Sequence, residues 1–347
     1  MCLGNKNPEA EGTDGVDLAA ARRMLEDAIG DKEAQHRFSC ENHLISPPLE
    51  KETAVTESVY DIAGRRIRIC CDWEYNDSDA FAQFMAGDGG CPAGERAADL
   101  IIRYHLTDEK MIFPEPPVCE TQYEKYYIAD GCLWRAYNAR PWLDVQTYIC
   151  YKNAKARPLE FPCFVLKSEL SRYRNSLNIL YAAGIEDIMM ELGVFILHSS
   201  FVCVGGRALL FSGPSGIGKS TQAILWEKHE NARIINGDRS AIVHEDGKWY
   251  ACGLPIAGSS RIFINERYEI AAIIFLEQAD SNSMRRAGGA EGVRLIAGES
   301  FSREGYAGGR ESTLMTAARL AGEVPVFKLC CLPDESAVEC AKEFLGV

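Results

Sequence analysis

The sequence predicts a mixed α/β protein of two domains, a β-rich domain followed by a domain built around a glycine-rich loop. Three features support this fold class. Strand-like segments run from residue 56 to about 170, the glycine-rich loop spans 211–221, and a hairpin-like stretch directly precedes that loop. Because strands outnumber helices in the second domain, 171–347, we expect a mixed sheet there and not a regular doubly wound one.

Residues 1–55 are predicted to form a helical and linker extension. The stretch LAAARRMLEDAIG is helical in pattern, and ISPPLEKET is a linker because consecutive prolines cannot continue a helix. The polar, acidic start lacks the charged-then-apolar order of a secretory signal. No run of about 18 apolar residues occurs, so we expect a cytoplasmic protein that does not bind or cross a membrane.

The β-rich domain is assigned to residues 56–170. YDIAGRRIRICCDW reads as two strands around a turn at Gly64, and further strands are expected at DLIIRYHL and VQTYICYK. YEKYYIADGCLWRAYN is a predicted hairpin, because Asp130-Gly131 between alternating residues is a strong turn signal. A helical stretch, ELSRYRNSLNILYAAGIEDIMMELG, follows. No motif in this domain indicates which ligand it would bind, so we expect a recognition or scaffolding role.

Composition limits the partners. The net charge is −13, from 37 basic and 50 acidic residues, which argues against nucleic acid and anionic membranes, because both require a basic surface. The 14 cysteines are scattered without zinc-ligand spacing, so we expect reduced thiols. A phosphate can still be held by backbone N–H groups and a single lysine.

The stretch FSGPSGIGKST matches the phosphate-loop pattern G-x-x-x-x-G-K-[ST]. Its glycines let backbone N–H groups turn toward phosphate oxygens, Lys219 would reach the β- and γ-phosphates, and the Ser220 hydroxyl would ligate Mg²⁺. A helix predicted to open at Ser220 adds its positive end. The predicted nucleotide contacts are Gly213, Pro214, Ser215, Gly216, Ile217, Gly218, Lys219, Ser220 and Thr221.

The hairpin before the loop, HSSFVCV-GG-RALLF, predicts where a histidine lies. With Gly205-Gly206 as the turn, Val204 faces Arg207, and His198 then lies opposite Gly213 at the start of the phosphate loop. His198 is therefore a candidate base or metal-site partner. The alternative is a strand-end histidine that hydrogen-bonds to the backbone.

The strand ARIINGD predicts an acidic group beside the same loop. Asp238 at its end could ligate Mg²⁺ or take a proton from an attacking hydroxyl, or it could be a turn aspartate. Arg239 could neutralise phosphate charge or be solvated. The segment GLPIAGSSR could shape the mouth of the site, with Arg261 pairing to phosphate, or it could be a connecting loop.

Later segments carry weaker predictions. Glu277 ends the buried strand EIAAIIFLEQ and resembles a second acidic motif, but its position at the end of a buried strand favours a structural role. SNSMRRAGGAEGV is expected to be flexible, with its arginines either covering an acidic substrate or solvated. Helical segments, a strand at VPVFKLCCLP and a helix at DESAVECAKEFL complete the chain.

HSSFVCVGGRALLFSGPSGIGKST and IINGDRSAI together resemble the catalytic domain of the HPr serine kinase/phosphorylase family. GLPIAGSSR, AAIIFLEQAD and VPVFKLCCLPDESAVE match in the same order, so the resemblance covers about 193–345 and extends more weakly to the β-rich N-terminal region. It is greatest to HPr-kinase-like proteins associated with peptide maturation clusters. The resemblance implies the phosphoenolpyruvate carboxykinase-like nucleotide fold, consistent with entry to the loop from an antiparallel hairpin.

The resemblance also implies ATP- and Mg²⁺-dependent phosphorylation of a serine on a protein or peptide. Lys219 and Ser220 would hold phosphate and metal, His198 would lie in the catalytic cluster, and Asp238 would be the base. This chain has Gly237 where the family has the first of two aspartates, and it lacks the signature of phosphorolysis. A small-molecule kinase and a nucleotide-binding scaffold stay open as alternatives, as does assembly into a homo-oligomer.

Overall fold

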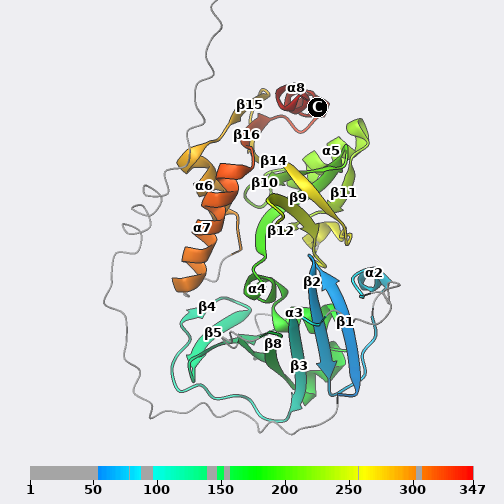
Figure 1. Ribbon diagram of the computed structural model, residues 1–347, viewed down its shortest axis with the longest axis vertical. Coiled ribbons are helices and arrows are strands. Elements are labelled where there is room, and N and C mark those ends of the chain that lie inside the picture. The colour runs from blue at the N-terminus through cyan, green and yellow to red at the C-terminus, as the bar shows by residue number, and fades with distance from the viewer. Residues whose placement is uncertain are drawn as a thin grey trace, which may run out of the picture.

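The computed structural model describes residues 54–77, 79–86, 97–138, 147–151, 157–256, 258–301 and 307–346. The predicted helix LAAARRMLEDAIG and the linker ISPPLEKET lie outside the described residues. Figure 1 shows two large sheets arranged along the long axis of the molecule, with short helices between them.

The N-terminal sheet is mixed and has eight strands in the order β1-β2-β3-β8-β7-β6-β5-β4. The strands are β1 (Thr56–Ile62), β2 (Arg65–Cys71), β3 (Leu100–Thr107), β4 (Cys119–Glu120), β5 (Glu124–Ala129), β6 (Cys132–Tyr137), β7 (Thr147–Tyr151) and β8 (Leu159–Leu166). Both predicted hairpins are confirmed, since Ile62 pairs with Arg65 and Ala129 pairs with Cys132.

The described residues of the N-terminal part form one helix between the strands and three after them. The short α2 (Asp79–Ala82) lies between β2 and β3. The 3₁₀ helix η1 (Lys167–Arg172), α3 (Ser176–Ala183) and α4 (Ile185–Glu191) follow β8 and lead the chain toward the second domain. The stretch expected to be helical is therefore interrupted. Asn175 caps α3, because its side chain accepts a hydrogen bond from the backbone N–H of Asn178. α3 ends at Gly184 in a left-handed conformation, which turns the chain into α4.

The C-terminal domain is built on a second eight-stranded sheet. Its elements are β9 (Phe195–Val204), β10 (Arg207–Ser212), α5 (Lys219–Glu230), β11 (Arg233–Asn236), β12 (Arg239–Glu245), β13 (Lys248–Gly253), η2 (Gly258–Ser260), β14 (Arg267–Gln278), β15 (Ser283–Arg286), α6 (Gly289–Gly298), α7 (Ala307–Glu323), β16 (Val326–Cys331) and α8 (Glu335–Leu345). Parallel and antiparallel pairs both occur, so the predicted mixed α/β class is confirmed.

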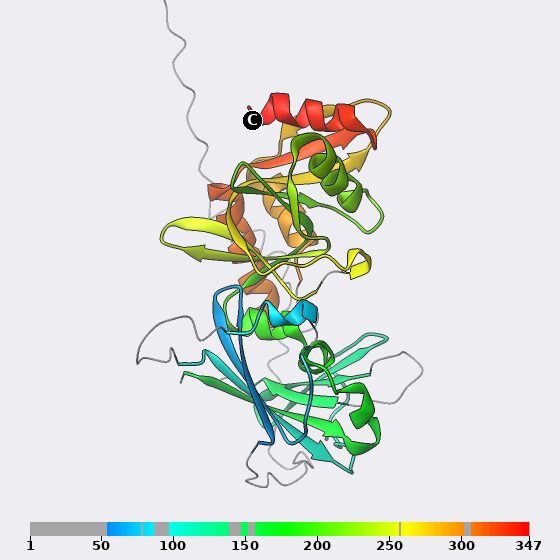
Figure 2. The ribbon, with the colours of Figure 1, turned by 90° about the vertical axis from the view of Figure 1, so that its right-hand side faces the viewer.

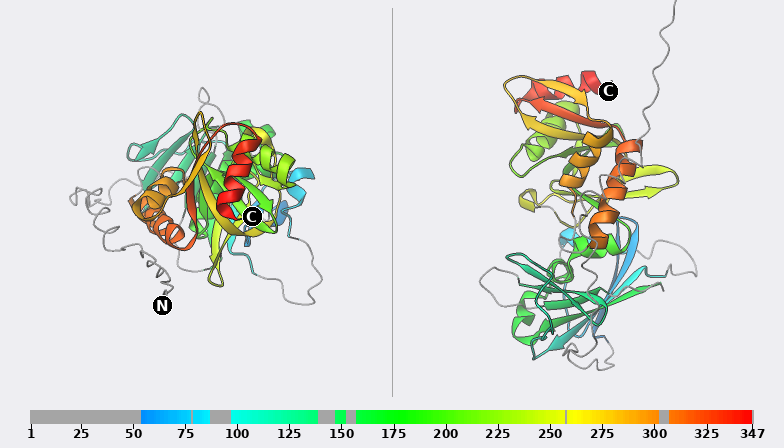
Figure 3. Two further views of the ribbon diagram at one scale, coloured as in Figure 1. Left: turned by 90° about the horizontal axis from the view of Figure 1, so that it is seen from above. Right: turned by 90° about the vertical axis from the view of Figure 1, so that its left-hand side faces the viewer.

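Helices cover both faces of this sheet. On one face, buried residues of α6 and α7 such as Ile296 and Leu320 pack against Leu210 and Ile273. On the other face, Trp226 of α5 and residues of α8 pack against neighbouring strand residues. Figure 2 and Figure 3 show α6 and α7 on the opposite side of the strands from α5 and α8.

Two long strands have several partners along their length. β9 pairs with β12 over 195–198 and with β11 over 201–203 on one edge, and with β10 over 199–204 on the other edge. β14 pairs with β13 at its start and with β10 and β16 farther along. The pairing of β9 with β10 ends at Ser199 and Ser212, directly before the glycine-rich loop.

One hydrophobic cluster joins the two domains. Buried side chains of the N-terminal sheet and of α3 and α4 lie in one cluster with Ile196, Ala241, Val243 and Cys252 of the C-terminal domain. Hydrophobic burial across this boundary holds the two sheets together. The predicted boundary at residue 170/171 thus lies between two sheets that this cluster connects, while further clusters lie within each part.

The segment SNSMRRAGGAEGV does not fit the expectation of flexibility. β15 within it pairs antiparallel with β16, and the rest begins α6. Arg285 forms ion pairs with Glu291 at 2.6 and 2.7 Å, which joins the strand to the helix. A long-range strand pairing, which a local glycine count does not reveal, orders this segment.

No helix in the described part of the chain combines the length and the apolar composition that a membrane crossing requires. The cysteines within the same described ranges are free thiols, and burial raises the pKa of several of them, including Cys71 and Cys163. Such thiols are packed as small apolar side chains.

Candidate functional site

The β9–β10 hairpin has the register that the sequence predicts. Val204 pairs with Arg207 and Ser199 pairs with Ser212, so His198 and Gly213 continue the two strands side by side. The Ser212 hydroxyl donates a hydrogen bond to the carbonyl of His198 at 2.9 Å, which closes the hairpin where the loop begins. Antiparallel pairing thus carries the imidazole to the edge of the glycine-rich loop.

The loop itself needs its glycines. Gly213, Gly216 and Gly218 have φ of +136°, +79° and +115°, a region that L side chains rarely adopt. The N–H of Ile217 donates to the carbonyl of Pro214 at 3.2 Å and closes the turn. Helix α5 then begins at Lys219, one residue earlier than predicted, and its first-turn amides and positive dipole end lie at the loop.

Lys219 is turned back onto the loop. Its ammonium donates to the carbonyls of Gly213 at 2.7 Å and Pro214 at 3.0 Å, and the residue is 7% exposed. Burial lowers its pKa, while the negative charges of Glu299 and Asp238 act in the opposite direction. The lysine therefore lies within electrostatic reach of the acidic groups described next, and its amine is held at the glycine-rich loop by two backbone carbonyls.

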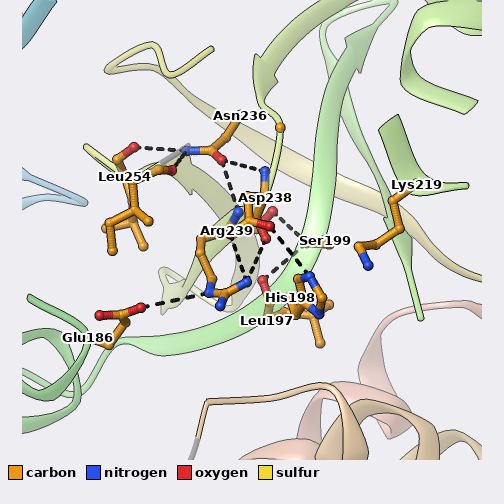
Figure 4. Close-up of polar contacts among 12 residues, drawn as sticks. Glu186, Leu197, His198, Ser199, Lys219, Asn236, Asp238, Arg239 and Leu254 are labelled. Atoms are coloured by element: carbon orange, nitrogen blue, oxygen red, sulfur yellow. Dashed lines mark hydrogen bonds and ion pairs between the residues drawn. The ribbon is translucent and has the colours of Figure 1, made fainter. Parts of the chain in front are cut away.

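Asp238, His198 and Glu299 form a chain of polar contacts (Figure 4 shows the first two). The imidazole Nε2 lies 3.5 Å from Oδ1 of Asp238, and Nδ1 lies 3.2 Å from Oε2 of Glu299. The hydrogen bond from His198 is the largest cause that lowers the pKa of Asp238, and the charge of Arg239 adds to it. Asp238 is therefore an ionised carboxylate at neutral pH, as a proton acceptor must be.

Glu299 is held beside His198 by backbone pairing as well as by its side chain. The N–H of His198 donates to the carbonyl of Glu299 at 2.9 Å, and Leu197 forms a bridge with Ser300. The segment after α6 thus adds a short stretch beside β9, at the end of β9 that does not pair with β10. Sequence reasoning missed Glu299, because no local pattern links it to a strand that lies so far away along the chain.

Asn236 holds the turn that carries Asp238. Its side-chain Oδ1 accepts hydrogen bonds from the N–H groups of Asp238 and Arg239 at 2.9 and 3.0 Å. Its Nδ2 donates to the carbonyls of Leu254 and Ile256, both at 2.8 Å, and the residue is fully buried. The Asn-Gly-Asp sequence signals this turn, in which the asparagine side chain replaces backbone partners.

The segment GLPIAGSSR lies against the same carboxylate. A Cβ on Gly258, whose φ is +52°, would lie 2.8 Å from Cγ of Asp238. The backbone therefore passes directly over Asp238, which favours the mouth of the site over a plain connecting loop. Arg261 in this segment is exposed, with φ of +55°.

Of the other charged candidates, Glu277 has a partner outside this cluster and Arg239 lies within it. Glu277 pairs with Lys328 at 2.6 Å, which supports the structural role. Arg239 contacts Oδ2 of Asp238 at 2.9 Å and lies 3.8 Å from Glu186 on α4. The structure thus brings His198, Asp238 and Arg239 together, and adds Glu186 and Glu299 to them.

The side chains of the site suit a metal ion that binds together with a nucleotide. They suit an ion held by protein ligands alone less well. Among the described residues, no group of three or more His, Cys, Asp or Glu side chains is arranged to hold a metal. Both oxygens of Asp238 already have partners, whereas Ser220 lies exposed on the first turn of α5. Mg²⁺ commonly takes one or two protein ligands together with phosphate oxygens and water, which suits this donor set.

Comparison with known proteins gives a weak match. No family model matches the chain, and no curated protein matches it. The solved structures that match include an HPr(Ser) kinase/phosphatase from Coxiella burnetii, with a TM-score of 0.26 and 13% sequence identity over 43% of this chain and 95% of that chain.

Proposed function

We propose that the protein is an ATP- and Mg²⁺-dependent phosphotransferase of the HPr-kinase-like type, with the phosphoenolpyruvate carboxykinase-like nucleotide fold. Its acceptor is a serine hydroxyl on a small protein or peptide. One observation carries the proposal: a hairpin register places His198 beside Gly213, and the same histidine contacts the Asp238 carboxylate. A phosphate-binding element and a proton acceptor thus meet at one edge of one sheet.

The proposed reaction is an in-line displacement at the γ-phosphorus. The acceptor hydroxyl gives its proton to Asp238 as its oxygen forms a bond to phosphorus, and the bond between the γ-phosphorus and the bridging oxygen breaks to leave ADP. Lys219 would donate to the phosphate oxygens and stabilise the charge that develops there. His198, between Asp238 and Glu299, keeps the accepting carboxylate oriented.

Ser220 would hold the metal ion together with phosphate oxygens, and Asp238 would also hold it if one of its oxygens gave up its contact with His198 or Arg239. Bound Mg²⁺ neutralises phosphate charge and polarises the γ-phosphoryl group. Gly237, at the position where the resemblance leads one to expect an additional aspartate, supplies no ligand, and its backbone is fixed: its N–H donates to Ile262 and its carbonyl accepts from Ser200. This position favours one alternative, a nucleotide-binding scaffold with little catalysis.

Transfer of radiolabelled γ-phosphate tests the proposal. The purified protein is incubated with labelled ATP and Mg²⁺, in one arm with a panel of serine-containing peptides and in another with a pool of small metabolites. Label in a peptide supports the proposal, and label in a small product alone supports a metabolite kinase. ATP binding without labelled product in either arm supports the scaffold.

A further inference from the structure

An elbow between α3 and α4 connects the two sheets. The helices meet at Gly184, with φ of +68°, where a Cβ would lie 2.8 Å from both the Asp187 carboxylate and the Tyr151 hydroxyl. The Tyr151 hydroxyl also donates to the carbonyl of Ala183 at 2.8 Å. The elbow is therefore packed tightly against β7, and only glycine fits at its corner.

Arg135 of β6 fixes the same elbow from inside the N-terminal sheet. This arginine is 3% exposed, and its Nη1 donates to the carbonyl of Ala182 at 2.8 Å. It pairs with Glu124 at 2.6 Å, and its Nε lies 3.7 Å from Asp187 in the first turn of α4. Tyr126 also donates to Asp187 at 3.1 Å. A buried charge network of this kind tolerates little displacement of its members.

The residue next to Asp187 makes contact with the other sheet. Oε1 of Glu186 lies 3.8 Å from Nε of Arg239, and Nη1 of the same guanidinium lies 2.9 Å from Oδ2 of Asp238 (Figure 4). Consecutive carboxylates in one helical turn thus face different partners. Asp187 is held by the N-terminal sheet, and Glu186 contacts the arginine that holds the candidate base.

We infer that Glu186 is a positioning residue for phosphoryl transfer: it fixes the Arg239 guanidinium, which in turn orients Asp238, and the N-terminal sheet holds Glu186 in place through Arg135 and Asp187. The inference rests on the proposed function, because Asp238 must accept the proton there. It gives the N-terminal domain a direct mechanical connection to the reacting group. Side chains of Glu186 and Arg239 are 22% and 26% exposed, so their pairing is partly shielded from water.

Steady-state kinetics of the transfer reaction provide the first test. Glu186→Gln keeps the shape of the side chain and removes its charge, and we expect kcat to fall about tenfold with KM for ATP unchanged. Glu227→Gln, at an exposed position of α5, is the matched control and should keep both constants. In an Arg239→Ala background, Glu186→Gln should cause no further loss, because the two residues act in series. An equal additional loss in that background overturns the inference.

A spectroscopic test does not depend on activity. The NMR signal of the Arg239 Nε–H, assigned by its loss in Arg239→Lys, should shift in Glu186→Gln, shift also in Asp187→Asn, and stay in place in Glu227→Gln. A signal unchanged in Glu186→Gln overturns the role of Glu186, and one unchanged in Asp187→Asn overturns its link to the N-terminal sheet. Shifts in both variants of a protein that transfers no phosphate would leave this contact standing while the proposed function fails.

Discussion

His198 and Asp238 approach within 3.5 Å of each other, Nε2 to Oδ1, because Asp238 lies in the break between two strands that both pair with β9. β11 pairs with β9 over 201–203 and β12 pairs with it over 195–198, where His198 is opposite Arg239. The pair is next to the glycine-rich loop because Gly213 continues β10. The strands on the two edges of β9 thus bring a carboxylate and the glycine-rich loop to the same histidine.

Glu299→Gln should slow phosphoryl transfer about tenfold while ATP affinity stays unchanged. Glu299 contacts Nδ1 of His198 at 3.2 Å, and loss of its charge leaves the imidazole free to turn away from Asp238. Transfer rates and calorimetric ATP binding check this expectation. Glu291→Gln, on the helix before Glu299, serves as the control, and an equal loss in both variants would argue against a specific role.

Asn236→Ala should destabilise the fold by about 3 kcal/mol, because four backbone groups lose their partner at a fully buried position. Urea unfolding of wild type and variant measures the difference. The same variant should lose transfer activity at temperatures where it is still folded, since Asp238 loses the bond that fixes its backbone. A loss below about 1 kcal/mol would show that water replaces the side chain.

Gly258→Ala should reduce transfer about tenfold without weakening ATP binding. The added Cβ lies 2.8 Å from Cγ of Asp238, so either the loop or the carboxylate must move. Gly247→Ala is the control: its φ is +77°, and nothing lies within 4 Å of the position that its methyl group would take, so it carries the backbone strain without the clash. If both variants keep full activity, the loop does not border the reacting group.

The ion pairs of Glu245 should make the stability of the fold depend on pH. The hydrogen bond from Arg267 is the main cause that lowers the pKa of Glu245, and Arg65 of the N-terminal sheet adds to it. A lowered pKa means that the charged form stabilises the fold above the ordinary value of about 4.3, and that this stabilisation is lost as pH falls through the lowered value.

Glu245→Gln should therefore lower the free energy of unfolding by about 0.5–1 kcal/mol at pH 7, a value limited by the exposure of the pair. The difference from wild type should disappear in strongly acidic solution. Urea unfolding across pH measures both effects, with Glu343→Gln on α8 as an exposed control. A difference that persists unchanged in acid would exclude the ion pairs as its source.

Local patterns in the sequence were sufficient for the hairpins and for the histidine. The Gly205-Gly206 turn sets the register of β9 and β10, so the position of His198 follows from residues a few places apart. Asn236 was within reach of the same reasoning, since Asn-Gly-Asp is recognisable turn chemistry. The functional roles of these residues stay predictions until they are measured.

Long-range pairing explains what sequence reasoning missed. Glu299 reaches His198 because its segment pairs with β9. Glu186 reaches Arg239 because one hydrophobic cluster holds the two domains together. The segment SNSMRRAGGAEGV was wrongly expected to be flexible, because its order comes from pairing with β16. The residues next to each of these positions in the sequence do not indicate which distant residue it contacts.

Phosphoryl transfer by Asp238→Asn tests the central claim most directly. The variant keeps the size of the side chain and the glycine-rich loop, so ATP should still bind while the rate of transfer to an acceptor peptide falls at least about 100-fold. Asp246→Asn, in the exposed turn between β12 and β13, should keep the wild-type rate. Transfer by Asp238→Asn at the wild-type rate would contradict the account, because the carboxylate beside His198 would then not accept the proton.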